Sequence, residues 1–305
     1  MAELKIGIIG CDTSHVPAFT RLLNDARDPF HVPGGRVVAA YPSFSPDLQP
    51  SYSRVEGFKQ ELVEKWGVQM VGSVEELVAQ VDAVLLESVD GRRHLAEARP
   101  VIAAGKPVYV DKPLAASYAD AATIIRLAQE RGCPLFSSSS LRYDANLAAI
   151  KEDPDLGAVL GCDAFSPATL DPTNPGLFWY GIHGVEILYT FMGRGCTRVR
   201  CTSTDKYDVV VGHWPQGRLG TVRGTRCGAH DYGATVFGEK KVAQATYSKT
   251  IPLYSRLLQK IVPFFQTGVS PVPLEETLEL MAFIQAAWIS AQEGREVTLE
   301  EVMLV

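Results

Sequence analysis

The segment at residues 10–15, which reads GCDTSH, could bind the pyrophosphate of a dinucleotide. Such sites use G-x-G-x-x-G between a strand and a helix, because the glycines permit a tight turn and close backbone approach to the phosphates. Here Asp12 and His15 replace the second and third glycines, while Thr13 and Ser14 offer donors to a phosphate. Facing a pyrophosphate at about 4 Å, Asp12 would repel it by about 1–4 kcal/mol. Alternatively, Asp12 points away and caps the helix, which leaves a capped helix with no phosphate.

The end of the second predicted strand bears on which nicotinamide cofactor would bind. An acidic residue usually binds the adenosine ribose there, but Tyr41, Pro42 and Ser43 occupy the position. This removes one argument for NAD and leaves NADP possible. Arg54 is a candidate for contact with a 2′-phosphate, although it could equally be a solvated side chain.

Metal chemistry is not expected from the sequence. His183 and Glu186 are three residues apart on a predicted helix, but no second pair of ligands accompanies them. The six cysteines are scattered without a C-x-x-C motif, which predicts reduced and mostly buried thiols. Cys11 lies near a predicted helix N-terminus and could be reactive.

Alternating strands and helices must position the 10–15 turn. Short apolar strands are predicted at residues 4–9, 36–41, 68–71, 82–87, 106–110 and 134–137, with helices between most of them. This alternation predicts a doubly wound parallel sheet, a Rossmann-type domain spanning residues 1–137. Sheets of this kind bind ligands at the carboxyl ends of their strands.

In the rest of the chain, residues 138–305, the predicted strands and helices no longer alternate. Period-2 strands are predicted at 197–202, 207–213, 218–223, 233–237 and 242–247, together with a strand at 158–165 and helices at 143–151, 180–192, 252–266 and 273–293. We therefore expect an α+β domain with a large open, mostly antiparallel sheet. One face of that open sheet is expected to be covered by the sheet of a partner subunit, which predicts a homodimer or homotetramer.

Composition narrows the classes of partner. The chain has 305 residues, 29 basic against 35 acidic, for a net charge of −6. This acidity argues against nucleic-acid binding and against adsorption to anionic membranes. No apolar run reaches the length of a membrane span and no signal-peptide pattern is visible, so a cytoplasmic protein is expected.

Several motifs share a resemblance that spans nearly the whole chain. They are residues 103–108 (AAGKPV) leading into Asp111–Ala115 (DKPLA), His94 twelve residues after Asp82, Leu141–Tyr143 (LRY), Tyr180–Glu186 (YGIHGVE), and Gln285–Ala287 with Ser290. In this order they resemble the glucose–fructose oxidoreductase / inositol dehydrogenase / MocA family. The resemblance implies a Rossmann domain followed by a domain with a large open sheet. It also implies NAD or NADP as cofactor and oxidation or reduction of a sugar, cyclitol or related polyol in carbohydrate metabolism.

The same resemblance implies roles for individual residues. Lys112 would polarise or protonate the substrate oxygen, and His183, with Tyr180 near it, would be the acid/base. The expected cofactor-binding residues are Gly10, Asp12, Thr13, Ser14, His15, Ser43, Ser88, Asp111, Lys112 and Pro113. The expected substrate contacts are Arg142, Trp179 and Glu186.

The family pattern places an aspartate four residues before the histidine, and Trp179 stands there in this chain. Glu186, Asp171 or Tyr180 could substitute for the missing carboxylate. Two other functions stay open beside the oxidoreductase. One is glycoside cleavage by transient oxidation with a retained cofactor, and the other is a cofactor-free binding or assembly module.

Overall fold

The computed structural model describes residues 3–304 and divides the chain into two compact units. The first unit comprises the chain up to Ala115, Asp120–Ser138 and Tyr254–Leu274. The second comprises Ala116–Ala119, Ser139–Leu253 and the chain from Glu275 onward. The sequence predicted a single change of domain at 137/138, whereas the segment 254–274 returns to the first unit.

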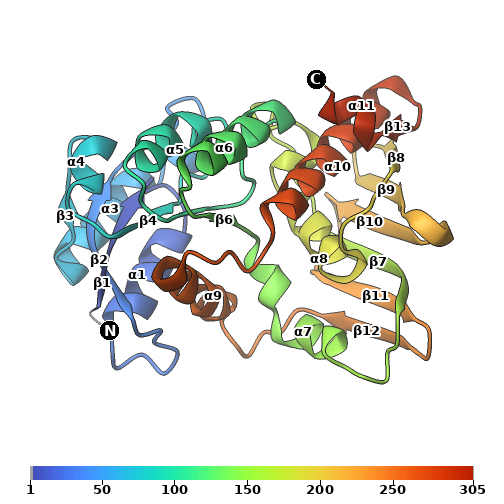
Figure 1. Cartoon of the computed structure of the whole chain (residues 1–305), viewed down its shortest axis with the longest axis horizontal. Coiled ribbons are helices and arrows are strands. Elements are labelled where there is room, and N and C mark those ends of the chain that lie inside the picture. The colour runs from blue at the N-terminus through green and yellow to red at the C-terminus, as the bar shows by residue number, and fades with distance from the viewer. Residues whose placement is uncertain (1–2, 305) are drawn as a thin grey trace. The chain divides into compact units, whose positions relative to one another are not determined.

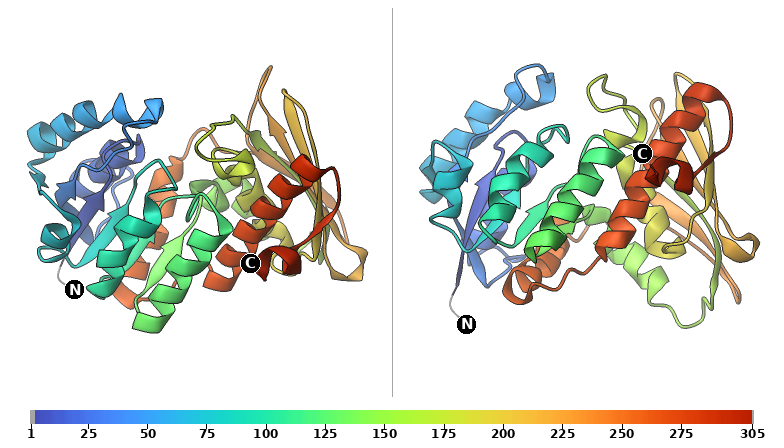
Figure 2. Two further views of the ribbon diagram at one scale, coloured as in Figure 1. Left: turned by 90° about the horizontal axis from the view of Figure 1, so that it is seen from above. Right: turned by 45° about the horizontal axis from the view of Figure 1, so that its top comes forward.

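The first unit is built on a six-stranded parallel sheet with the order β3-β2-β1-β4-β5-β6. Helices cover both of its faces, as predicted for a doubly wound sheet (Figure 1; Figure 2). The strands are β1 (Leu4–Ile9), β2 (Gly35–Tyr41), β3 (Gln69–Met70), β4 (Ala83–Leu86), β5 (Val108–Val110) and β6 (Leu135–Ser137). The helices are α1 (His15–Asn24), α2 (Gln49–Tyr52), α3 (Val55–Trp66), α4 (Val74–Val78), α5 (His94–Ala103), most of α6 (Tyr118–Arg131) and nearly all of α9 (Leu253–Thr267).

Local sequence explains these elements. The strands β4 and β5 are buried along their whole length, as expected of parallel strands covered on both faces. Ser73 accepts a hydrogen bond from the Glu76 amide at 3.1 Å and so caps the N-terminus of α4. Gly67 takes the left-handed conformation that ends α3.

The second unit is built on a seven-stranded sheet with the order β12-β11-β7-β10-β9-β8-β13. Its central strands β7 and β10 pair in parallel and the other neighbours pair antiparallel, which confirms the mostly antiparallel sheet. The strands are β7 (Val159–Pro167), β8 (Arg198–Ser203), β9 (Tyr207–His213), β10 (Leu219–Thr225), β11 (Gly233–Gly238), β12 (Val242–Thr246) and β13 (Val297–Thr298). The helices are α7 (Ala145–Lys151), α8 (Ile182–Met192), α10 (Leu274–Glu293) and α11 (Leu299–Met303), with short 3-10 turns η1 (Ser140–Tyr143), η2 (Gly176–Phe178) and η3 (Pro215–Gly217).

Helix α8 is the core helix of the second unit, and all of its residues are buried. Its Gly184 lies against the sheet so closely that a Cβ there would be 2.8 Å from Ser166 Oγ and 2.9 Å from Val222 Cγ1. A glycine at this position therefore lets α8 pack closely against β7 and β10.

Helix α9 joins the first unit through its aromatic residues. Phe264 packs edge-on against Phe136 of β6, and Tyr254 packs against His15 and Phe19 of α1. An amphipathic pattern identifies such a helix but not the surface that it covers. The sequence analysis therefore found α9 but grouped it with the second domain, whereas it belongs to the first unit. Among residues 3–304, no helix has the length and hydropathy needed to cross a membrane.

Candidate active site

The turn after β1 starts with a glycine that no other residue could replace without strain. Gly10 has φ +86°, and a Cβ there would lie 2.4 Å from the Ser88 backbone nitrogen. The amides of Gly10 and Cys11 donate to the carbonyls of Tyr41 and Ser43, which ties the turn to the end of β2. The turn therefore keeps the tight geometry that the first glycine of a dinucleotide motif provides.

Asp12 is fully buried, and its carboxylate accepts hydrogen bonds from two other segments of the first unit. Oδ2 accepts from Ser51 Oγ at 2.5 Å, and Oδ1 accepts from the Val89 amide at 3.0 Å. Burial raises the pKa of this carboxyl, although both hydrogen bonds act to lower it. Ser51 belongs to α2 and Val89 to the loop after β4, so Asp12 connects both of these segments to the turn.

The N-terminus of α1 is consequently open to an anion. Its N-cap residue Ser14 makes no side-chain capping bond, and the first turn contains no acidic residue. Thr13 Oγ1 is a distant acceptor for the His15 amide, at 3.5 Å. A helix start of this kind, following a tight glycine turn, is a site that a pyrophosphate fits.

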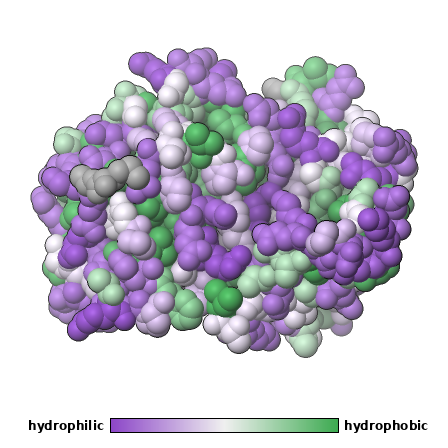
Figure 3. All heavy atoms as spheres, turned by 60° about the horizontal axis from the view of Figure 1, so that its bottom comes forward, coloured by the Kyte–Doolittle hydropathy of each residue, from purple (hydrophilic) through white to green (hydrophobic). Residues whose placement is uncertain are grey.

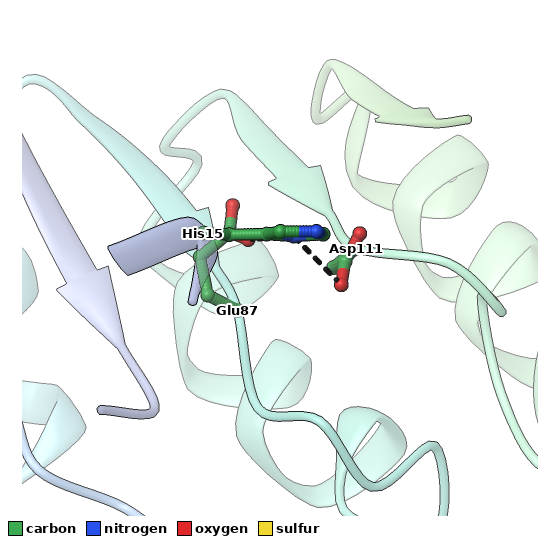
Figure 4. Close-up of side chains that lie close together, drawn as sticks. All are labelled: His15, Glu87 and Asp111. Atoms are coloured by element: carbon green, nitrogen blue, oxygen red, sulfur yellow. Dashed lines mark hydrogen bonds and ion pairs between the residues drawn. The ribbon is translucent and has the colours of Figure 1, made fainter. Parts of the chain in front are cut away.

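His15 begins α1 and contacts two buried carboxylates (Figure 4). Its Nδ1 lies 3.1 Å from Asp111 Oδ2 and 3.3 Å from Glu87 Oε2. Burial by itself lowers the pKa of His15, but Asp111, Tyr254 and Glu87 together outweigh burial and raise the pKa well above its ordinary value. Burial raises the pKa of Glu87 to about 7, while the cations of His15 and Lys112 overcome burial and lower that of Asp111.

The loop after β2 places Ser43 beside a carboxylate that the sequence analysis missed. Ser43 Oγ donates to Glu97 of α5, and Glu97 also accepts from Ser88 Oγ at 2.6 Å and from Arg93 at 2.8 Å. Glu97 lies 54 residues after Ser43, so no local pattern indicates the contact. An acidic group therefore stands near the end of β2, although the residues there are not acidic. The predicted candidate Arg54 donates to the Pro50 carbonyl in its own segment.

Lys112 lies in the loop after β5, next to a cis peptide bond to Pro113. The buried His94 braces this loop: Nδ1 faces the carbonyls of Pro113 and Leu114 at 3.0 and 3.2 Å, and Nε2 faces the Ser88 carbonyl at 2.7 Å. The predicted cofactor-binding residues thus gather in the loops after β1, β2, β4 and β5, at the carboxyl edge of one sheet.

His183 lies near the start of α8 in the second unit. Its Nδ1 is 2.7 Å from Ser139 Oγ, and its ring packs edge-on against Tyr180 and Tyr232, with centroids 5.4 and 5.6 Å away. One partner of this imidazole is therefore a hydroxyl, in a chain where Trp179 replaces the carboxylate expected before the histidine. Ser139 was not among the predicted site residues, and it lies 44 residues from His183.

Glu186 does not pair with His183 among the hydrogen bonds of the second unit. Its carboxylate accepts from the Ser139 amide at 3.1 Å and from Arg142 Nε at 2.7 Å, and Arg142 also binds Glu276 at 2.6 Å. Burial raises the pKa of Glu186, and Arg142 opposes this rise. Glu186 and Arg142 thus form a buried ion pair that holds the Ser139 segment.

The other candidate residues have plainer surroundings. Trp179 is half-buried and ends η2, while Asp171 accepts from Thr173 within its own turn. Cys11 is fully buried, and burial raises the pKa of its thiol to about 12, so its expected reactivity is not supported.

Comparison with known proteins agrees with this arrangement. Residues 4–139 match the model of the glucose–fructose oxidoreductase / inositol dehydrogenase / MocA family, described as an oxidoreductase family with an NAD-binding Rossmann fold. The match covers the six strands of the first unit's sheet. Among characterised relatives, inositol 2-dehydrogenase of Cereibacter sphaeroides is 38% identical over 115 residues, 37% of this chain and 33% of the relative. Inositol 2-dehydrogenase of Burkholderia cenocepacia is 32% identical over 164 residues, 51% of this chain and 42% of the relative. The chain thus matches less than half the length of these relatives.

Solved structures extend the likeness in fold across both units. A probable dehydrogenase from Thermotoga maritima has a TM-score of 0.79 at 22% identity, covering 98% of this chain and 100% of that one. Myo-inositol 2-dehydrogenase from Lactobacillus plantarum has a TM-score of 0.79 at 15% identity, covering 97% and 99%. GenD2 from gentamicin A biosynthesis, solved with NAD, has a TM-score of 0.78 at 18% identity, covering 98% and 97%. At these identities the likeness establishes the fold alone, over nearly the whole length of the chain.

Proposed function

We propose that this protein is an NAD(P)-dependent oxidoreductase acting on a sugar, cyclitol or related polyol. The observation that carries the proposal is the turn Asp111–Pro113 (D-K-P). It follows the carboxyl end of β5, within the segment that matches the glucose–fructose oxidoreductase / inositol dehydrogenase / MocA family model. The nicotinamide, when bound, would supply hydride acceptance or donation. The chain's own residues would bind the dinucleotide, orient the substrate and move the hydroxyl proton.

The dinucleotide would be held by the Gly10 turn and the open N-terminus of α1. Asp12 does not obstruct this site, because its carboxylate is bonded to Ser51 and Val89. On the adenosine side, Ser43 and the adjacent Glu97 are the groups that would meet the ribose. Both NAD and NADP need testing, since an acceptor carboxylate and the Arg93 guanidinium stand together there.

Lys112 and His183 are the proposed catalytic residues. Lys112 would polarise the substrate oxygen, and His183 would exchange its proton through Nε2 while Ser139 orients the ring from Nδ1. Ser139 is a positioning residue in this scheme. Tyr180 and Tyr232 confine the imidazole from two sides and would line the approach of the substrate.

Purified protein tests the proposal directly. Titration calorimetry with NAD(H) and NADP(H) should reveal binding of at least one of them, and myo-inositol and a sugar panel should then give absorbance of the reduced nicotinamide. Absence of binding by both cofactors would rule the proposal out. Release of free sugar from a glycoside without net reduced cofactor would identify cleavage by transient oxidation instead.

We also propose self-association through the open face of the seven-stranded sheet. Phe237 and Leu219 both lie opposite Gly161, and Val242 pairs with Phe237, so three exposed apolar side chains form one row across four strands. On the face drawn in Figure 3, polar and apolar side chains are interspersed. Light scattering should give a dimer or tetramer that L219K with F237K converts to a monomer, whereas a monomeric wild type would exclude this assembly.

We place the protein in the cytoplasm, where its six free cysteines would stay reduced.

A further inference from the structure

Three side chains from separate elements converge beside the dinucleotide turn. His15 begins α1, Glu87 follows β4 and Asp111 follows β5, and β1, β4 and β5 are neighbours in the sheet. One ligand atom from each lies within 4.8 Å of the other two, and all three residues are buried. This His15–Glu87–Asp111 cluster contains a histidine where the dinucleotide motif has its third glycine.

Two oxygens of the cluster lack partners. Glu87 Oε1 and Asp111 Oδ1 are buried and accept no hydrogen bond from any residue in the described range 3–304. Leaving a buried acceptor unsatisfied is costly, and such atoms in a native protein call for an ion or water that completes them. A divalent cation would complete both carboxylates at once, in the place that the imidazolium of His15 occupies as an ion-pair partner when no metal is bound.

The spacing of the ligand atoms fits a metal centre. Zinc ligands lie about 2.0–2.2 Å from the ion, so two ligands at a tetrahedral angle are about 3.3–3.6 Å apart. The separations from His15 Nδ1 are 3.1 Å to Asp111 and 3.3 Å to Glu87. They equal this spacing within a few tenths of an ångström.

The imidazole is also held in place. Phe19 stacks on the ring at 5.4 Å with an interplanar angle of 15°, and Tyr254 of α9 packs edge-on at 4.7 Å. In Figure 4 the nitrogen-bearing edge of the ring points toward Asp111. A ligand fixed in this way loses little conformational entropy on binding a metal.

We propose that His15, Glu87 and Asp111 bind one divalent transition-metal ion. One imidazole nitrogen with two carboxylate oxygens suits Zn²⁺ or Mn²⁺, whereas Ca²⁺ and Mg²⁺ prefer ligand sets made of oxygen alone. The site goes beyond the proposed oxidoreductase function and departs from the sequence-based expectation of no metal. Its binding is measured without nicotinamide or substrate, so the result does not depend on enzymatic activity.

The test uses the full chain after treatment with a chelator and dialysis. Zn²⁺ and Mn²⁺ are titrated in separate calorimetric arms, and bound metal is counted by elemental analysis. We expect one ion per chain for at least one metal. E87Q and D111N, which keep the side-chain shape and remove the charge, should each weaken binding by more than the roughly 10–100-fold caused by loss of an outer-shell partner.

E97Q is the matched control, because Glu97 is another buried carboxylate on the same side of the sheet but lies outside the cluster. It should bind metal like the wild type. Absence of saturable binding by the folded wild type, or equal binding by E87Q and D111N, would overturn the proposal and leave an ion pair of His15 with its carboxylates. Should circular dichroism show that either variant is unfolded, the visible spectrum of Co²⁺ bound to the wild type, compared with H15Q, decides the question.

Discussion

Replacing Gly10 by alanine is expected to destabilise the protein by about 2–5 kcal/mol. The left-handed conformation at φ +86° costs an alanine about 1–2 kcal/mol. The new Cβ would lie 2.4 Å from the Ser88 nitrogen and 2.6 Å from its Cα, and relieving an overpacked contact of this kind costs about 1–3 kcal/mol more. The third obstructing atom is Ser88 Oγ at 2.5 Å, but rotation of that side chain would leave the clashes with the backbone nitrogen and Cα in place.

Gly105→Ala is the matched control for this variant. Gly105 also has a left-handed φ, +65°, but a Cβ there would meet no atom within 4 Å. This substitution should cost only the conformational part, about 1–2 kcal/mol. The difference between the two variants therefore isolates the contact of the turn with the Ser88 loop.

Urea unfolding followed by circular dichroism measures both variants against the wild type. We expect a lower midpoint with an unchanged slope for each, and the larger shift for G10A. Equal destabilisation of the two would refute the reasoning, because it would mean that the loop after β4 moves away without cost.

Four further predictions follow from the two units. Lys112→Met should lower kcat by about 10²–10⁴-fold with cofactor affinity retained, measured by steady-state kinetics and calorimetry. Ser139→Ala should leave the fold intact and alter the pH profile of kcat through His183, whereas a purely structural role would leave that profile unmoved. Burial raises the pKa of Asp12, so the stability that this group contributes is full below about pH 4 and falls as pH rises through the raised pKa. The variant D12N cannot ionise at this position. Urea titrations should therefore show D12N gaining stability relative to the wild type from acid to neutral pH. Ellman's reagent should modify Cys227, the half-buried thiol, well before the five buried ones, and comparable rates for all six would contradict the structure.

Local patterns predicted most elements of the fold. The strands β1 and β9 match their predicted bounds, 4–9 and 207–213, since the pattern of apolar residues acts over a few neighbouring residues. The site depends on longer connections. A sequence cannot tell where the Asp12 carboxylate points when its partners Ser51 and Val89 lie 39 and 77 residues away. Helical spacing suggested that Glu186 could face His183, but Arg142 takes that carboxylate instead.

The return of α9 to the first unit has a consequence for synthesis. The chain passes from one unit to the other after residues 115, 119, 138, 253 and 274. On the ribosome, the six-stranded sheet is thus complete in sequence at Ser137, but the surface that α9 covers stays bare until that helix emerges. At about 5–20 residues per second, the wait lasts roughly 7–27 s. A fragment ending at Ser138 would lack the contacts of Phe136 with Phe264 and of Phe19 with Tyr254, so we expect it to be less stable than the first unit of the full chain.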